Sequence, residues 1–163
     1  MIRALIDGNV LDYLADNPDA LVAVNAATLT GRLRLLGTQI LRAELDAMKG
    51  KQHKLPRWRE LTAVLDSLDL DPVPLAAFML DYSALDGPDD LATDEQSDQH
   101  ERMTRGQRNR AEDAMLAMTA SAHDAVLITS DSDLFNHATE QNIPVANPPA
   151  LAWLARGILA DLP

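Results

Sequence analysis

The chain has 163 residues, 47% of them hydrophobic, no cysteine and a formal net charge of −11. These numbers suit one domain with a sizeable core, and they exclude disulfides, thiol catalysis and thiolate zinc sites. The absence of cysteine fits a reducing compartment, and no apolar run reaches the roughly 18 residues of a membrane span. We therefore expect a cytoplasmic protein with no membrane segment and no signal peptide.

Positive charge is concentrated in two places although the chain is acidic as a whole. Ten of the fourteen Lys and Arg residues fall in segments 42–59 and 102–110. The net charge argues against a general binder of polyanions. The two basic segments are either solvated helix faces or a local track for a phosphate backbone, and the sequence leaves both interpretations open.

The first short apolar run, 2–6, predicts a strand that ends at Asp7. Asp-Gly-Asn follows as a turn, and a helix begins close behind it. Asp7 is either the cap of that helix or a functional carboxylate. A second helix is expected over 18–29, with proline in its first turn, and a second strand over 33–38.

A helix over about 39–48 carries Glu44, which is either an exposed helix residue or a site carboxylate. Residues 50–56 form a basic connector in this interpretation. The apolar residues of 58–68 share one face of a further helix. Two prolines within 70–74 favour an edge strand or a loop.

Residues 81–101 break the alternation of strands and helices, with eight acids and no Lys or Arg. After a helix over 75–82, we interpret them as part of an acidic insertion or loop at about 81–107. This segment is either a solvated extension of the next helix, or a lid or partner-binding segment near the site.

The stretch 109–135 combines a helix, a strand and three acids. Asp113 lies near the start of the helix, where alanine is frequent and apolar residues recur at helical spacing. The following run, AVLITS, predicts a strand buried on both faces. Asp131 and Asp133 come directly after it.

The end of the chain predicts a helix, a short strand and a second helix. The first helix covers 134–141, with Asp131 or Ser132 near its N-cap. The strand covers 143–146 and stops at two prolines. In the amphipathic C-terminal helix, Trp153 is expected to pack on the sheet or on another subunit.

This alternation predicts an α/β protein with three layers, α/β/α, around a central, mostly parallel sheet of four to five strands. Ligand sites in such sheets form beyond the carboxyl ends of the strands. Asp7 and Asp131 would face one crevice if the first and fourth strands are neighbours, and the helices bearing Glu44 and Asp113 can line its rim. Clustered carboxylates raise each other's pKa unless a cation neutralises them, and all-oxygen ligands select Mg²⁺ or Mn²⁺.

The ordered set of motifs resembles the PIN-domain nucleases, in particular the small single-domain group that includes VapC-type toxin ribonucleases. The resemblance covers nearly the whole chain except the acidic insertion. The matching residues are Asp7 and Asn9 after the first strand, Thr38 and Glu44 in TQILRAEL, Asp113, Leu116 and Ala120 in the long helix, and Thr129, Asp131, Asp133, Leu134 and Phe135 in TSDSDLF.

The resemblance implies a metal-dependent endoribonuclease that hydrolyses single-stranded or structured RNA. Its catalytic acids would be Asp7, Glu44, Asp113 and Asp131, and its Mg²⁺ or Mn²⁺ ligands would be Asp7, Asp113, Asp131 and Asp133. Asn9 and Thr129 would orient the acids or bound water by hydrogen bonding. Arg42, Arg105, Arg108 and Arg110 are candidates to neutralise substrate phosphates.

Partners and alternatives follow from the same resemblance. A toxin would have an antitoxin protein that inserts basic side chains into the acidic cleft, and the net charge of −11 would steer it. A homodimer is also expected. The alternatives are a non-catalytic PIN-like module that binds proteins and a nuclease acting on DNA. A receiver-like domain is disfavoured because no lysine follows Lys54.

Overall fold

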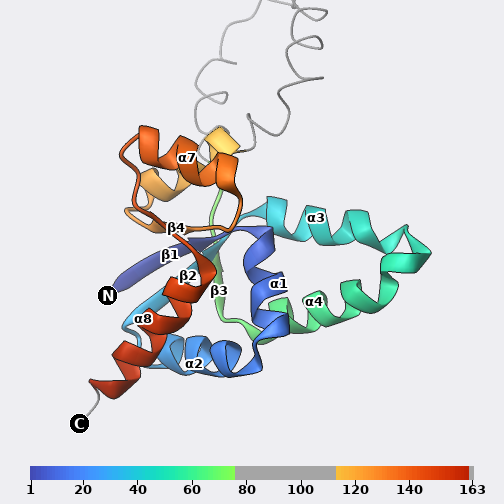
Figure 1. The fold of residues 1–163 in the computed structure, drawn as a ribbon, viewed down its shortest axis with the longest axis horizontal. Helices are drawn as coiled ribbons and strands as arrows, with labels where there is room; N and C mark the ends of the chain where they lie inside the picture. The colour runs from blue at the N-terminus through green and yellow to red at the C-terminus, as the bar shows by residue number, and fades with distance from the viewer. Residues whose placement is uncertain (76–112, 162–163) are drawn as a thin grey trace, which may run out of the picture.

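Five parallel strands form the centre of the fold, as the computed structural model of residues 1–75 and 113–161 shows (Figure 1). The strands are β1 (Ile2–Ile6), β2 (Leu33–Gly37), β3 (Leu70–Pro72), β4 (Val126–Ile128) and β5 (Val145–Ala146). Their order is β3-β2-β1-β4-β5, and every neighbouring pair is parallel. The predicted parallel sheet is therefore confirmed, and β1 and β4 are neighbours at the centre.

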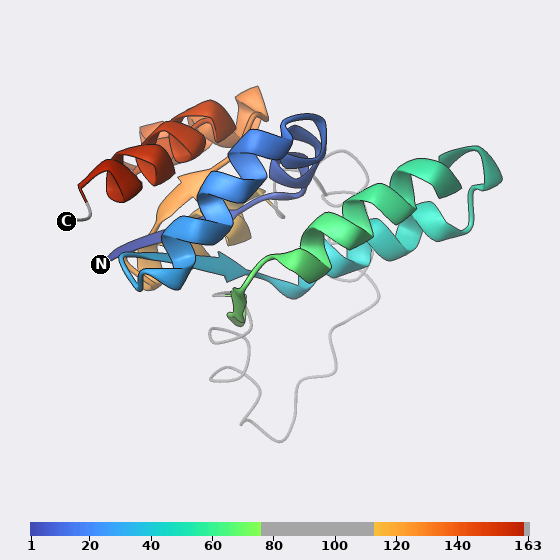
Figure 2. The same cartoon turned by 90° about the horizontal axis from the view of Figure 1, so that it is seen from below.

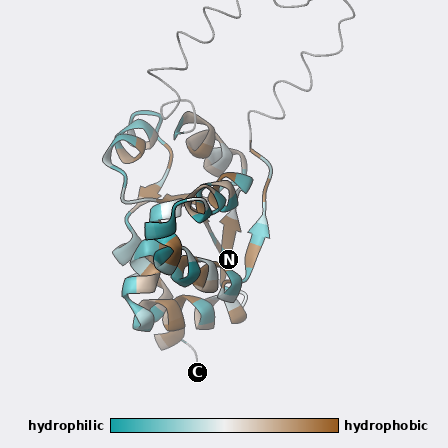
Figure 3. Ribbon diagram, turned by 90° about the vertical axis from the view of Figure 1, so that its right-hand side faces the viewer, coloured by the Kyte–Doolittle hydropathy of each residue, from teal (hydrophilic) through white to brown (hydrophobic). Residues whose placement is uncertain are grey.

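Helices cover both faces of the sheet, which confirms the predicted three layers. One face carries α1 (Gly8–Asp16), α2 (Pro18–Leu29) and α8 (Pro148–Ala160), and the other carries a helix over residues 113–122 and α7 (Ser132–Glu140). Ala4 and Ile6 of β1 pack in the first layer, whereas Leu5 packs in the second. Successive strand residues point to opposite faces, so β1 is buried on both. Figure 3 accordingly shows mainly apolar colour on the central strands.

Two helices, α3 (Gln39–Lys49) and α4 (Leu55–Ser67), form an antiparallel pair that projects from the sheet (Figures 1 and 2). A 3₁₀ turn, η1 (Gln52–Lys54), joins them. The prediction of an irregular connector up to residue 56 is wrong at its end, since α4 begins at Leu55. Pro56 is compatible with this start, because the first turn of a helix needs no N–H from it.

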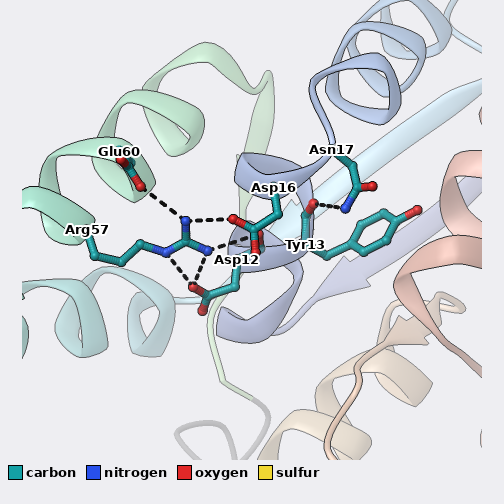
Figure 4. A network of polar contacts seen from close by, with 6 residues as sticks. All are labelled: Asp12, Tyr13, Asp16, Asn17, Arg57 and Glu60. Carbon is teal, nitrogen blue, oxygen red and sulfur yellow. Dashed lines mark hydrogen bonds and ion pairs between the residues drawn. The ribbon is translucent and has the colours of Figure 1, made fainter.

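Arg57 fastens this pair to α1 (Figure 4). Its guanidinium donates hydrogen bonds to Asp16 at 2.8 Å, to Asp12 at 2.9 Å and to Glu60 of its own helix at 3.1 Å. These carboxylates, Asp16 first, raise the pKa of Arg57 above its ordinary value. The arginine side chain is 32% exposed, so solvent screens the network only in part. These contacts join α4 to the later part of α1, the helix that begins directly after Asp7.

The C-terminal part differs from the prediction in one detail. Pro148 and Pro149 form the first turn of α8, whereas the sequence assigned them only to the end of the strand. Trp153 is 76% exposed on α8, so of its two predicted contacts the one with the sheet is not made and the one with another subunit stays a prediction. The predicted helix beyond Leu75 and the acidic segment at 81–107 lie outside the described residues. No helix within the described ranges is long and apolar enough to cross a membrane.

Candidate active site

Asp7 and Thr129 leave neighbouring strands side by side. Ile6 of β1 is in register with Ile128 of β4, and each of the two polar residues comes next in its chain. The Thr129 hydroxyl donates a hydrogen bond to Asp7 Oδ2 at 2.9 Å. The backbone N–H of Gly8 donates to Oδ1 at 2.7 Å, so Asp7 is also the N-cap of α1. The carboxylate is thereby held in one orientation.

Asn9 connects the loop after β1 to the loop after β4. Its amide group donates to Asp7 Oδ2 at 2.6 Å and to the Thr129 hydroxyl at 3.2 Å. Its carbonyl oxygen accepts from the backbone N–H of Ser130 at 2.8 Å. The Thr129 hydroxyl also accepts from the backbone N–H of Asp131 at 3.0 Å. The structure thus places Asn9 and Thr129 in direct contact with Asp7 and with the loop that carries Asp131.

Asp131 is the N-cap of α7, one of the two positions that the sequence suggested. Its Oδ1 accepts from the backbone N–H groups of Asp133 at 2.8 Å and Leu134 at 3.0 Å. Both bonds use the same oxygen, which leaves Oδ2 without a hydrogen bond from the described residues. Asp131 can therefore cap the helix and still present an oxygen to a ligand.

Glu44 reaches the same edge of the sheet from α3. Its carboxylate lies so close to the Cα atom of Gly8 that a methyl group at residue 8 would collide with Glu44 Oε2. The lack of a side chain at Gly8 therefore makes room for Glu44 beside Asp7.

One hollow of about 340 Å³ collects these carboxylates, and we call it the carboxylate pocket. Its lining residues are Asp7, Asn9, Ile40, Glu44, Asp113, Leu116, Asp131 and Asp133. Five acids from two loops and three helices thus share one space at the carboxyl end of the sheet. All the acids that the motifs indicated are among them.

Burial and mutual repulsion raise the pKa values of two of these acids, Asp7 and Asp113. Burial raises the pKa of Asp7, and the charge of Asp131 acts in the same direction, against hydrogen bonds from Thr129 and Gly8. Burial also raises the pKa of Asp113, followed by the negative charges of Asp131, Asp7 and Asp133. The described lining residues of the pocket include no Lys or Arg. The pocket is therefore a place where a bound cation would be stabilised.

Comparison with known proteins agrees with this architecture. No protein-family model and no curated protein sequence matches the chain. Its structure resembles a PilT N-terminus domain protein from the archaeon Sulfolobus solfataricus, with a TM-score of 0.50, 14% sequence identity, and coverage of 94% of this chain and 93% of that one. The chain has a PIN-domain fold.

Two further structures share the PIN fold. VapBC2 from Rickettsia felis, solved with a promoter DNA fragment, aligns with a TM-score of 0.52 at 15% identity, covering 90% of this chain and 98% of that one. VapBC-1 from nontypeable Haemophilus influenzae aligns with a TM-score of 0.51 at 19% identity, covering 91% and 99%. At identities this low, structural similarity shows the fold alone. The chemistry of this PIN-fold protein must therefore be argued from its own residues.

His137 extends the site of the PIN-fold protein along α7. A hollow of about 400 Å³ is lined there by Asp113, Asp133, Asn136, His137 and Glu140. The sequence analysis named no histidine among the site residues, so it missed His137. The signal was the spacing of Asp133 and His137, because residues four apart on a helix lie on one face. The His137 side chain opposes the rise in the pKa of Asp113.

The predicted substrate-binding arginines are not brought to the carboxylate pocket within the described residues. Arg42 lines a separate hollow beside α3 and contacts Asp66 at 3.5 Å. Arg105, Arg108 and Arg110 lie outside the described residues.

The carboxylate oxygens that line the carboxylate pocket are suitable ligands for a hard divalent cation. Within residues 1–75 and 113–161, no three Asp, Glu or His side chains are close enough together to hold one ion at once. Mg²⁺ does not need such a cage, because it keeps several water ligands and binds proteins through one or two carboxylates. Asp7, which is fixed in orientation, and the open oxygen of Asp131 meet that requirement. Zn²⁺, which favours nitrogen and sulfur, is a poorer match.

Proposed function

We propose that this PIN-fold protein is a metal-dependent endoribonuclease that uses Mg²⁺ or Mn²⁺. The observation that carries the proposal is the carboxylate pocket, where Asp7, Glu44, Asp113, Asp131 and Asp133 converge. Such a concentration of negative charge opposes folding unless a cation offsets it, so a structural role alone does not account for it. The assignment to RNA is supported by the resemblance of the motifs to toxin ribonucleases.

Hydrolysis of a phosphodiester needs an activated water, a neutralised phosphate and a stabilised leaving oxygen. A divalent cation, when bound, supplies all three functions. Asp7 is held for this purpose by donors from Gly8, Asn9 and Thr129. Asp113 approaches from another helix, and burial raises its pKa above the ordinary value, which favours it as an acceptor for a proton of the attacking water.

The test is cleavage of labelled single-stranded RNA, and of DNA of the same sequence, with Mg²⁺, Mn²⁺ or EDTA. Asp113→Asn is the informative variant, because no hydrogen bond within the described part of the chain depends on its carboxylate. Asp7→Asn is less clean, since its amide would face the donors of Asn9 and Thr129. Asp161→Asn, exposed at the end of α8, is the matched control.

Cleavage of RNA that needs both metal and Asp113 would support the proposal. Cleavage of DNA alone would make the protein a deoxyribonuclease. If neither the RNA nor the DNA is cut and metal does not raise the melting temperature, the carboxylate pocket is not a metal site. A non-catalytic module that binds proteins then becomes the better hypothesis.

The VapC-like motifs also support a role as the toxin of a toxin–antitoxin pair. The partner would be a small protein that places basic side chains in the carboxylate pocket, steered by the net charge of −11. Purification from the native host without any small partner would count against this role. A homodimer with exposed Trp153 at its contact is the expected oligomer, and the mass in solution of the parent and of Trp153→Ser tests it.

A further inference from the structure

A second hollow, of about 560 Å³, lies beside α3, and we call it the α3 hollow. Ile40 and Glu44 of α3 line the carboxylate pocket, whereas Thr38, Gln39 and Arg42 line the α3 hollow. The start of α3 therefore separates the two spaces. The remaining lining residues are Gly37, Ala43, Asp46, Pro72, Val73 and Pro74.

The two hollows open at the same edge of the sheet. Leu5 of β1 is in register with Leu36 of β2. Asp7 and Thr38 each lie two residues beyond that pair, so both leave the sheet at its carboxyl edge. A single-stranded nucleic acid bound in the carboxylate pocket therefore needs only to cross the start of α3 to enter the α3 hollow.

Thr38 has an unused hydroxyl. It is the N-cap of α3 and only 6% exposed, but its side chain makes no capping hydrogen bond. Because Thr38 lines the hollow and its hydroxyl makes no hydrogen bond within the described residues, the hydroxyl is free to donate to a ligand bound there. The first N–H groups of α3 also lack partners within the helix, and the helix dipole favours an anion there.

Arg42 adds positive charge one turn after Thr38. Its side chain is 67% exposed and contacts Asp66 of α4 at 3.5 Å. An exposed pair of this kind contributes little, so the guanidinium can turn to a phosphate at small cost. Asp46 lies one turn further along the same hollow, and its charge restricts an anion to the first turn of α3.

We propose that the α3 hollow binds a non-scissile phosphate of the single-stranded RNA. This inference rests on the proposed nuclease function and deepens it. The phosphate accepts hydrogen bonds from the amides at the start of α3 and from the Thr38 hydroxyl, and it pairs with Arg42. The attached nucleoside packs on Pro72, Val73 and Pro74. An acidic protein thus gains one local position for the backbone of its substrate.

The experiment titrates the uncleaving Asp113→Asn protein with a five-nucleotide RNA and, separately, with inorganic phosphate, while amide NMR signals are followed. The signals of Gln39 and Ile40 should shift and saturate with RNA. Adding Thr38→Val or Arg42→Gln should weaken RNA binding about tenfold, as expected for loss of a hydrogen bond to a charged group. In the active protein the same changes should raise KM and leave kcat nearly unchanged.

Two controls make the result interpretable. Thr38→Val keeps the shape of the side chain and removes no capping bond, so its melting temperature should not fall. Arg156→Gln removes an equal charge from exposed α8 and should bind RNA like the parent.

The outcomes separate this inference from the nuclease proposal. If Thr38→Val and Arg42→Gln bind RNA like the parent, the α3 hollow is not a substrate position, even if cleavage is observed. Shifts with inorganic phosphate but not with RNA would also overturn it. If no RNA is cleaved but binding depends on Thr38, the nuclease proposal fails and the α3 hollow stands as an RNA-binding position.

Discussion

Asp7 and Thr129 are 122 residues apart in the sequence, yet the Thr129 hydroxyl donates a hydrogen bond to Asp7 Oδ2 at 2.9 Å. The same hydroxyl accepts from the Asn9 amide and from the backbone N–H of Asp131. Thr129 is fully buried, so water cannot replace these bonds. One side chain therefore sets the position of Asp7 relative to the loop that carries Asp131.

Thr129→Val should lower both stability and activity. The substitution leaves the Asp131 N–H without its acceptor and removes a donor from Asp7, at a cost of about 1–3 kcal/mol in the free energy of unfolding. We expect cleavage per folded molecule to fall about tenfold or more. Urea unfolding and kcat measure the two effects. Thr119→Val is the burial-matched control, since the Thr119 hydroxyl donates to Met115 within its own helix. Unchanged kcat in Thr129→Val would contradict the positioning role.

Gly8→Ala should separate activity from stability. The added methyl group collides with Glu44 Oε2, which lies at the end of a flexible side chain and can move away. Alanine suits a helix better than glycine, so the free energy of unfolding should stay equal or rise by roughly 0.5 kcal/mol. Cleavage should fall because Glu44 is displaced. Gly157→Ala in α8 meets open space and should leave cleavage unchanged. A fully active Gly8→Ala protein would show that the position of Glu44 is unimportant.

Asp113→Asn should stabilise the metal-free protein. The pKa of Asp113 is raised first by burial and then by repulsion from Asp131, Asp7 and Asp133, and a neutral amide removes both effects. Because the carboxylate is largely screened by solvent, the gain at neutral pH should be only about 0.5 kcal/mol. The rise in melting temperature caused by Mn²⁺ should become smaller. A metal-free variant less stable than the parent would argue that the acids do not repel each other.

The metal-free protein should lose stability from this site as the pH rises. The folded pKa values of Asp7 and Asp113 lie above the ordinary value of 3.8, so the native state holds these protons more tightly than the unfolded chain. Their contribution is full below 3.8 and is lost as the pH rises through the folded pKa values. Urea unfolding at several pH values measures it. The gain of Asp113→Asn over the parent should grow across that window, and a constant difference would contradict the shift.

The local sequence was sufficient to predict most elements and their type. In β1, residues alternate between the two layers, and the short apolar run that allows this is visible in the sequence. Asp7 and Asp131 were indicated as site residues because each follows such a run directly. Helix boundaries were less accurate, as the early start of α4 shows, because proline in a first turn does not by itself distinguish a helix from a connector.

The tertiary structure decided which side chains meet. Arg42 and Glu44 are two residues apart, but the rotation of the helix puts them in different hollows. His137 joins Asp113 because α7 and the helix over 113–122 cover the same face of the sheet. The sequence by itself determined that carboxylates end the strands, since apolar patterning and residue spacing are local properties. It did not determine the hydrogen bonds of these carboxylates, because they depend on strand order and on register between residues more than a hundred positions apart. It also did not determine that the Thr38 hydroxyl makes no capping bond, because that depends on the geometry at the start of α3.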